Sequence, residues 1–158
     1  AVADLDTVYV PVGCGSGLCG TIAARDALGL KTKVVGVVSA HVDAAKRSFE
    51  AGKLLPSPTA HTFADGVAVC TPVQDALDVF GKGAERFVAA TDDEVAEAIR
   101  AYWQDTHNLA EGAGAVALAA LMQEQDAMKG KRVAVILSGG NMDQAQAAQV
   151  LGGETPRV

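Results

Sequence analysis

Short runs of β-branched residues alternate along the chain with longer alanine-rich segments. The short runs are continuously apolar, which is typical of strands covered on both faces. We expect these strands at residues 7–12, 33–38, 86–89 and 132–137. The alanine-rich segments have apolar positions three or four residues apart, which predicts helices. We expect these helices at residues 18–28, 42–51, 73–80, 113–125 and 142–150. Strands joined by crossover helices predict an α/β fold of three layers, with a mostly parallel, twisted sheet between helices on both faces.

Residues 91–94 have the spacing of a helix start. Thr91 and Glu94 lie three positions apart, as in a capping box, where each side chain bonds the backbone amide of the other residue. A helix should begin there and bury an apolar stripe. The stripe consists of Val95, Ala98, Ile99 and Tyr102. We also expect a short element around Val67 and a loop, rich in proline, at residues 54–62.

Composition and charge restrict what the chain binds. With 158 residues, 49% of them hydrophobic, we expect one domain over residues 1–158 with a frayed tail at 151–158. The formal net charge of -6 argues against binding to nucleic acid or to anionic membranes. No apolar stretch approaches the roughly 20 residues that cross a bilayer, and the first residues lack the positive charge of a signal peptide. We expect a cytoplasmic protein with a small-molecule ligand.

The cysteines form no metal-binding or disulfide pattern. Cys14, Cys19 and Cys70 contain no CxxC pair, and the three histidines are scattered along the sequence, which argues against structural zinc. We expect buried, reduced thiols.

Two glycine-rich runs each follow an expected strand and precede an expected helix. The first is GCGSG at residues 13–17, and the second is SGG at residues 138–140. In a parallel sheet both runs would lie at the carboxyl edge, where open α/β folds bind ligands. Glycine turns expose backbone N–H groups, and the following helix adds its positive end, a combination that suits a phosphate. The alternative is a pair of ordinary tight turns.

Residues 15–20 also match the dinucleotide fingerprint G-x-G-x-x-G in its strand-turn-helix setting. That fold needs an acidic residue at the end of the second strand to bind the ribose, and the first acid after residues 33–38 is Asp43. The acidic residue that would bind the ribose of a dinucleotide is therefore missing. An NAD(P)-binding module remains an alternative, because a phosphorylated ribose needs no acid. A Walker loop is excluded because Gly-Lys-Ser/Thr does not occur.

Four longer motifs occur in a characteristic order. They are VPVGCGSGLCG at 10–20, FADGVAV at 63–69, EGAGAVALAAL at 111–121 and VAVILSGGNMD at 133–143. Together they resemble the pyridoxal-phosphate (PLP) enzymes of the threonine dehydratase and serine racemase group. The resemblance extends from residue 6 to about residue 150. It implies the C-terminal half of such an enzyme, in the large-domain portion of fold type II.

The resemblance assigns the first glycine run to the cofactor phosphate. Backbone N–H groups of the run, together with the Ser16 hydroxyl, would hold the phosphate. The residues concerned are Gly13, Cys14, Gly15, Ser16 and Gly17. The family usually has glycine throughout this run, so the backbone at Cys14 and Ser16 must avoid positive φ or accept strain.

Three further residues match family positions around the cofactor ring. Ser138 matches a serine whose hydroxyl meets the pyridine nitrogen, and this neutral partner suits β-elimination. Glu111 matches a glutamate that lines the ring. Gly66 matches a glycine beside the reacting centre, and Asp65 would then brace the loop. Taken alone, the same residues also fit a turn serine, a solvated carboxylate at a helix start and a turn glycine.

Relatives with a divalent-cation site carry a glutamate and an aspartate at the positions of Val38 and Ala44. Neither of these side chains offers an oxygen ligand, so we predict no metal.

The cofactor needs a lysine amine to form its Schiff base, and no lysine here lies in a setting like that of the family. Four lysines precede strands and belong at the amino edge, and Lys82 is the one loop lysine left open. The four are Lys31, Lys33, Lys129 and Lys131. In the family the attaching lysine lies upstream of the first strand found here. We expect a partial chain that is inactive alone, and that forms a homo-oligomer or pairs with the missing N-terminal half.

The activity implied by the resemblance is removal of ammonia from L-threonine or L-serine to give a 2-keto acid. A racemase is a neighbouring interpretation, because the substrate contacts are expected upstream. Two alternatives of other classes stay open: the NAD(P)-binding module, and a non-catalytic fragment whose loops hold a stray anion.

Overall fold

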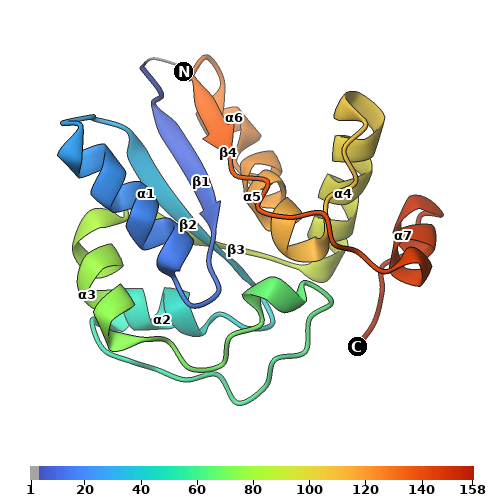
Figure 1. The fold of residues 1–158 in the computed structure, drawn as a ribbon, viewed down its shortest axis with the longest axis horizontal. Coiled ribbons are helices and arrows are strands. Elements are labelled where there is room, and N and C mark those ends of the chain that lie inside the picture. The colour runs from blue at the N-terminus through green and yellow to red at the C-terminus, as the bar shows by residue number, and fades with distance from the viewer. Residues whose placement is uncertain (1–3) are drawn as a thin grey trace.

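The computed structural model describes residues 4–158 and contains a parallel sheet between two layers of helices (Figure 1). The strands stand in the order β3-β2-β1-β4, and each neighbouring pair is parallel. The strands are β1 (Thr7–Pro11), β2 (Lys33–Ser39), β3 (Arg86–Ala90) and β4 (Val133–Val135). The helices are α1 (Ser16–Ala27), α2 (Ala44–Ala51), the 3-10 helix η1 (Asp65–Val67), α3 (Gln74–Gly83), α4 (Asp92–Thr106), α5 (Gly112–Gln123), α6 (Gln125–Met128) and α7 (Gln144–Leu151).

Both faces of the sheet are buried, because successive side chains of a strand point to opposite sides. On β1, Val8 and Val10 belong to a core with Leu18 of α1, whereas Tyr9 belongs to a core with α4 and α5. Helices α1 and α2 cover the first face, and α5 covers the second, with α4 packed on α5 (Figure 1). The predicted three-layer α/β fold is confirmed. No helix in residues 4–158 is both long enough and apolar enough to cross a membrane.

Helix α4 begins where the sequence predicts. The Thr91 hydroxyl accepts a hydrogen bond from Glu94 N at 3.3 Å, and Glu94 Oε2 accepts one from Thr91 N at 2.7 Å. The predicted apolar stripe of this helix is buried against α5. The capping box and the stripe are therefore confirmed, as are the loop at residues 54–62 and the short element near Val67.

Strand β4 is shorter and more exposed than predicted. It has three half-buried residues, and the next two side chains, Ile136 and Leu137, are 39% and 38% exposed. The expectation of a buried strand over 132–137 is therefore wrong. The reason is that β4 lies at the edge of the sheet, with no further described strand beside it to cover the apolar run. At the C-terminus, residues 154–158 form no helix or strand, and Pro156 among them is buried.

A polar cluster of Tyr9, Arg86 and Glu124 connects β1, β3 and the end of α5. Glu124 accepts hydrogen bonds from the Tyr9 hydroxyl and from Arg86, whose Nε lies 3.0 Å from Glu124 Oε1. Arg86 Nη2 also donates to the Tyr9 hydroxyl at 3.2 Å. Hydrogen bonds from Arg86 lower the pKa of Glu124, while burial and the Glu124 carboxylate raise the pKa of Tyr9. The three polar groups therefore satisfy one another beside the apolar core.

Glu124→Gln should lower the free energy of unfolding by about 1–2 kcal/mol at neutral pH, because it removes a partly exposed carboxylate that Arg86 and Tyr9 bond. The folded-state pKa of Glu124 lies below its unfolded value of about 4.3. Its contribution is therefore complete above that pH and is lost as the pH falls through the folded-state pKa.

Urea unfolding at several pH values measures this effect. The difference between wild type and Glu124→Gln should shrink from about pH 5 to about pH 3. Glu97→Gln, at an exposed position of α4, is the matched control. An equal loss of stability in both variants would show that the cluster contributes nothing specific.

Candidate functional site

The two glycine loops leave the same edge of the sheet side by side. Tyr9 of β1 pairs with Val135 of β4, and Ile136 N donates to Tyr9 O at 3.0 Å. Three residues beyond the Tyr9–Val135 pair come Val12, which directly precedes the first glycine run, and Ser138, which begins the second. The predicted common carboxyl edge is confirmed, and it lies toward the bottom of Figure 1.

The first loop presents unpaired backbone amides. Val12 N donates to Val37 O and Cys19 N donates to Gly15 O, whereas no amide between them, in residues 13–18, donates to a residue that the structure describes. Gly15 has φ 97° and ψ -4° and precedes the first residue of α1. Glycine adopts this left-handed conformation without strain, so the chain can turn from the loop directly into the helix.

Cys14 and Ser16, which depart from an all-glycine run, avoid backbone strain. Within residues 4–158, positive φ at a non-glycine residue occurs at Asp4 and His107, so both departures keep ordinary backbone angles. Ser16 is exposed, and its hydroxyl bonds to no described residue. The expectation of a buried thiol is wrong for Cys14, which is exposed because its glycine neighbours have no side chains to cover it.

The start of α1 favours a negatively charged ligand. The helix has 12 residues, and its first turn carries no acidic side chain. The amides of Ser16, Gly17 and Leu18 lack carbonyl partners in the described chain, and such free amides carry the partial positive charge of a helix N-terminus. Together with the Ser16 hydroxyl, they are the donors that a phosphate group needs. The loop therefore fits the phosphate of the predicted cofactor.

Gly66 lies directly against this loop. A Cβ atom built on Gly13 would be 2.7 Å from Gly66 O, and one built on Gly66 would be 2.8 Å from Ala113 Cβ. Contacts this short leave no room for a side chain, so the two glycines let η1 fit between the loop and the start of α5. Asp65 Oδ1 accepts a hydrogen bond from Gly66 N at 2.7 Å, which confirms the loop-bracing role predicted for Asp65.

Glu111 is held against the second glycine loop. Its N–H donates to Gly139 O at 3.1 Å, and its Oε2 accepts from Asn141 N at 3.1 Å. A Cβ atom on Gly139 would lie 2.1 Å from Glu111 Oε1, and one on Gly114 would lie 2.3 Å from Gly139 O. Helix α5 therefore packs directly on the loop. The half-buried Glu111 carboxylate bonds that loop and does not cap its own helix.

These contacts bring the predicted site residues into one neighbourhood. The contacts lead from Gly13 to Gly66, through the start of α5 to Glu111, and on to residues 138–140. Ser138 and Gly66 are exposed, and the Ser138 hydroxyl bonds to no described residue. The sequence did not point to Asn141 as a partner of Glu111. Its backbone amide makes the hydrogen bond, and almost every residue type has such an amide.

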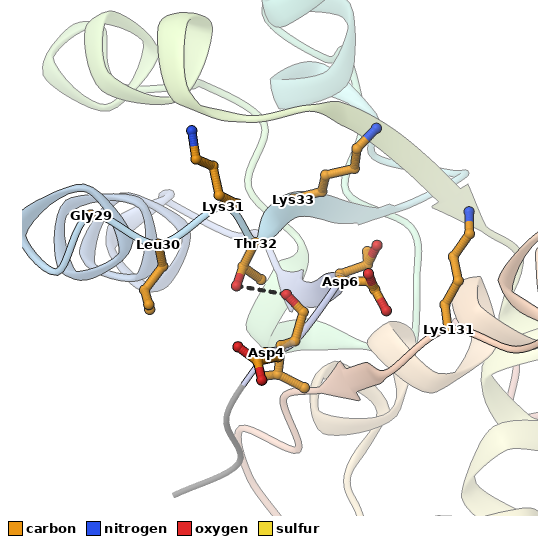
Figure 2. A pocket seen from close by; sticks show the side chains of 10 residues that line it. Asp4, Asp6, Gly29, Leu30, Lys31, Thr32, Lys33 and Lys131 are labelled. Atoms are coloured by element: carbon orange, nitrogen blue, oxygen red, sulfur yellow. Dashed lines mark hydrogen bonds between the residues drawn. The ribbon is translucent and has the colours of Figure 1, made fainter.

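A hollow of about 610 Å³ lies at the opposite, amino edge of the sheet, as Figure 2 shows. Its lining includes three lysines and two aspartates, namely Lys31, Lys33, Lys131, Asp4 and Asp6. The predicted amino-edge position of these three lysines is confirmed. Size favours this hollow as a ligand site, but two carboxylates line it and Lys33 is paired with Glu85 at 2.6 Å. The free amides of the first glycine loop suit a phosphate better.

Lys82 lies in helix α3, so the expectation of a loop lysine is wrong. The helix continues through Gly81 to Gly83, where the missing side chain lets Ile22 of α1 pack closely. Arg25 Nη1 also donates to Gly83 O at 2.8 Å. Lys82 is therefore beside the second half of α1, about 10 Å along that helix from the glycine loop.

In residues 4–158 no group of three or more His, Cys, Asp or Glu side chains is close enough to hold a metal ion. Val38 is buried in β2, and Ala44 is the buried first residue of α2. The absence of a metal stays a prediction.

Comparison with known proteins agrees with this geometry. A protein-family model described as pyridoxal-phosphate dependent enzyme matches residues 2–139. L-threonine ammonia-lyase of Thermotoga maritima is 35% identical over 140 residues, which cover 89% of this chain and 35% of that protein. Threonine deaminase isoform 2 from Solanum lycopersicum has a TM-score of 0.89 and 28% identity, over 96% of this chain and 46% of that one. Serine racemase from Dictyostelium discoideum has a TM-score of 0.81 and 28% identity, over 90% of this chain and 46% of that one.

The chain thus spans less than half the length of each of these proteins. The resemblance to the threonine dehydratase and serine racemase group is confirmed, and so is the type II fold of PLP enzymes. PLP is the cofactor of this family. Because the family model matches residues 2–139 of 158, the chain belongs to the family of pyridoxal-phosphate-dependent enzymes.

Proposed function

We propose that this chain is the cofactor-holding part of a PLP-dependent L-threonine or L-serine ammonia-lyase. The intact enzyme would convert the hydroxy amino acid into a 2-keto acid and ammonia. The observation that carries the proposal is the set of free amides at residues 13–18, connected by direct contacts to Glu111 and the loop of Ser138. The names of two relatives, L-threonine ammonia-lyase and threonine deaminase, support this reaction.

Each predicted residue has a role in holding or orienting the cofactor. The amides of residues 13–17 and the Ser16 hydroxyl would bind the phosphate. The Ser138 hydroxyl would bond the pyridine nitrogen, Glu111 would line the ring, and Gly66 would lie on the substrate side. Bound PLP withdraws electrons from the amino acid, which weakens the bonds at its α carbon. The neutral Ser138 hydroxyl leaves the nitrogen uncharged, a setting that suits β-elimination.

We propose further that the chain does not turn over substrate alone. PLP enzymes attach the cofactor to a lysine amine, and the lysines of this chain include three at the opposite edge of the sheet and Lys82 on α3. The attaching lysine would come from polypeptide outside these 158 residues. The exposed Ile136 and Leu137, near the free edge of β4, offer apolar surface to such a segment or to a second copy.

An NAD(P)-binding module is the rival for the same glycine loop. Strand β2 ends at Ser39, whose hydroxyl accepts a hydrogen bond from His41 N at 3.2 Å. The nearest following acid, Asp43, is paired with Arg47 at 2.7 Å. In the described chain no unpaired carboxylate follows this strand end to bind a ribose, which disfavours NAD; NADP, whose phosphorylated ribose needs no acid, is tested by the competition experiment below.

Pyridoxamine 5′-phosphate has the ring and phosphate of PLP but forms no bond with lysine, so it is a clean probe of the site. In titration calorimetry it should bind the wild-type chain, and NAD⁺ and NADP⁺ should not compete. Gly15→Ala should weaken binding about tenfold, because a side chain at φ 97° costs about 1–2 kcal/mol and its Cβ would lie 3.0 Å from Ala76.

Gly29→Ala is the matched control for Gly15→Ala. Its φ is 63°, so the substitution also strains the backbone, but a Cβ there would have nothing within 4 Å. This variant should keep wild-type affinity for pyridoxamine 5′-phosphate. Absence of binding to the wild type, or equal weakening in both variants, would contradict the proposed phosphate site.

Gly139→Ala should displace the Glu111 carboxylate, since the new Cβ would lie 2.1 Å from Glu111 Oε1. We expect about tenfold weaker binding of pyridoxamine 5′-phosphate. The double variant Glu111→Ala/Gly139→Ala should bind no more weakly than Glu111→Ala alone, because the clash is gone. Strictly additive losses would mean that Gly139 does not act through Glu111.

Borohydride reduction tests whether the chain carries the attaching lysine. At one PLP per chain, reduction and peptide mapping should label no single lysine stoichiometrically. The longer L-threonine ammonia-lyase of Thermotoga maritima is the positive control. Full labelling of one lysine in this chain, abolished by its replacement with arginine, would overturn the proposal that the chain is incomplete.

A further inference from the structure

Thr62 is a buried polar residue with an unusual set of partners. It is 4% exposed, its hydroxyl donates to Asp92 Oδ1 at 2.5 Å, and the same hydroxyl accepts from Ala64 N at 3.2 Å. The other oxygen of Asp92, Oδ2, accepts from Phe63 N at 3.4 Å. One carboxylate therefore holds two consecutive residues of the segment that leads to Gly66. This segment, residues 62–67, is called the spacer loop below.

Asp92 belongs to a rigid part of the molecule. It is the first residue of α4, a helix of 15 residues that begins with a capping box and packs along α5. Its carboxylate lies in the first turn, where the helix dipole favours negative charge. The anchor for the spacer loop is therefore fixed by a helix and not by another loop.

The spacer loop has no other hydrogen bond to a distant part of the described chain. Its remaining backbone bonds all stay within residues 60–69, for example those from Val67 N to Ala64 O at 3.0 Å and from Thr62 N to Ala60 O at 3.1 Å. The bond between Thr62 and Asp92 spans 30 residues. Apart from packing, the Asp92 carboxylate is thus what fixes the position of the loop.

The position of the spacer loop sets the spacing of the cofactor site. Ala64 is fully buried, and a Cβ atom built on Gly112 would be 2.7 Å from Ala64 Cα. At its other end, Gly66 lies against both Gly13 and Ala113. The spacer loop therefore lies between the start of α5, which carries Glu111, and the first glycine loop, which is the proposed phosphate-binding loop. The thickness of the spacer loop sets the distance between these two segments.

We propose that Thr62 and Asp92 are positioning residues that hold the spacer loop against the phosphate-binding loop. This inference rests on the proposed function for its effect on the cofactor. Without the bond, the segment from Thr62 to Gly66 gains freedom, and the amides of residues 13–18 lose a fixed neighbour. The consequence is weaker binding of the phosphorylated ring without loss of the fold.

The test compares matched variants of the two residues. Thr62→Val removes the hydroxyl at nearly constant volume, Thr62→Ser restores it, and Thr59→Val makes the same change at an exposed threonine of the preceding loop. Asp92→Ala removes the anchoring carboxylate, and Asp93→Ala removes the adjacent exposed one from the same helix turn. The two threonine variants lose the same hydroxyl and keep the β-branch, and the two aspartate variants lose the same charge from the first turn of α4.

Two readouts are needed, and the first requires no ligand. In hydrogen-exchange mass spectrometry, Thr62→Val and Asp92→Ala should speed exchange in peptides covering residues 62–69 and leave the peptides of β1 and β2 unchanged.

In calorimetry, both variants should bind pyridoxamine 5′-phosphate about tenfold more weakly, as expected for loss of a hydrogen bond to a charged group. Thr62→Ser and both controls should match the wild type. The double variant Thr62→Val/Asp92→Ala should lose less affinity than the sum of the two single losses, because the shared bond between Thr62 and Asp92 can be removed only once.

Unchanged exchange and unchanged affinity in Thr62→Val would overturn the inference. Faster exchange throughout the chain would also overturn it, because Thr62 would then support the whole fold and not the position of one loop. If Thr62→Val does not fold, failure of Asp92→Ala to differ from Asp93→Ala overturns it. If the wild type itself fails to bind pyridoxamine 5′-phosphate, the proposed function fails, and the ligand-free exchange still decides whether the anchor exists.

Discussion

The close approach of backbone segments at glycine is the constraint on which the rest of the site depends. Gly13 lies against Gly66, Gly66 lies against Ala113, and Gly114 lies against Gly139, with no room for a side chain at Gly13, Gly66 or Gly114. Four segments that are distant in sequence therefore pack as one unit at the carboxyl edge of the sheet. A ligand held by the amides of residues 13–18 would have its surroundings defined by backbone, which moves less than long side chains do.

Helix α5 connects this edge to the opposite end of the molecule. Its first end carries Glu111 and the close contacts to the glycine loop, while its last turn leads to Glu124, which bonds Tyr9 and Arg86. Glu111 and Glu124 are separated by about 20 Å of helix. The polar cluster therefore fixes the last turn of α5 against two strands of the sheet. The first end of α5 contacts the glycine loops, and the candidate site lies there.

Much of this organisation could be predicted from the sequence, because it depends on local patterns. The Thr91 capping box needs only its own four residues, and the common edge of the glycine runs follows from parallel strands. The exposure of Ile136 depends on whether another strand lies beside β4, which an apolar run does not reveal. The bond from Thr62 to Asp92 joins residues 30 apart with no periodicity, so only coordinates disclose it.

The most direct test of the phosphate site is a chemical-shift map of pyridoxamine 5′-phosphate on the ¹⁵N-labelled chain. The largest amide shifts should fall on residues 13–18, with smaller ones at Glu111 and residues 138–141. Shifts centred on Lys31 and Lys131 at the amino edge, or no localised shifts at saturating ligand, would contradict a cofactor phosphate held at the start of α1.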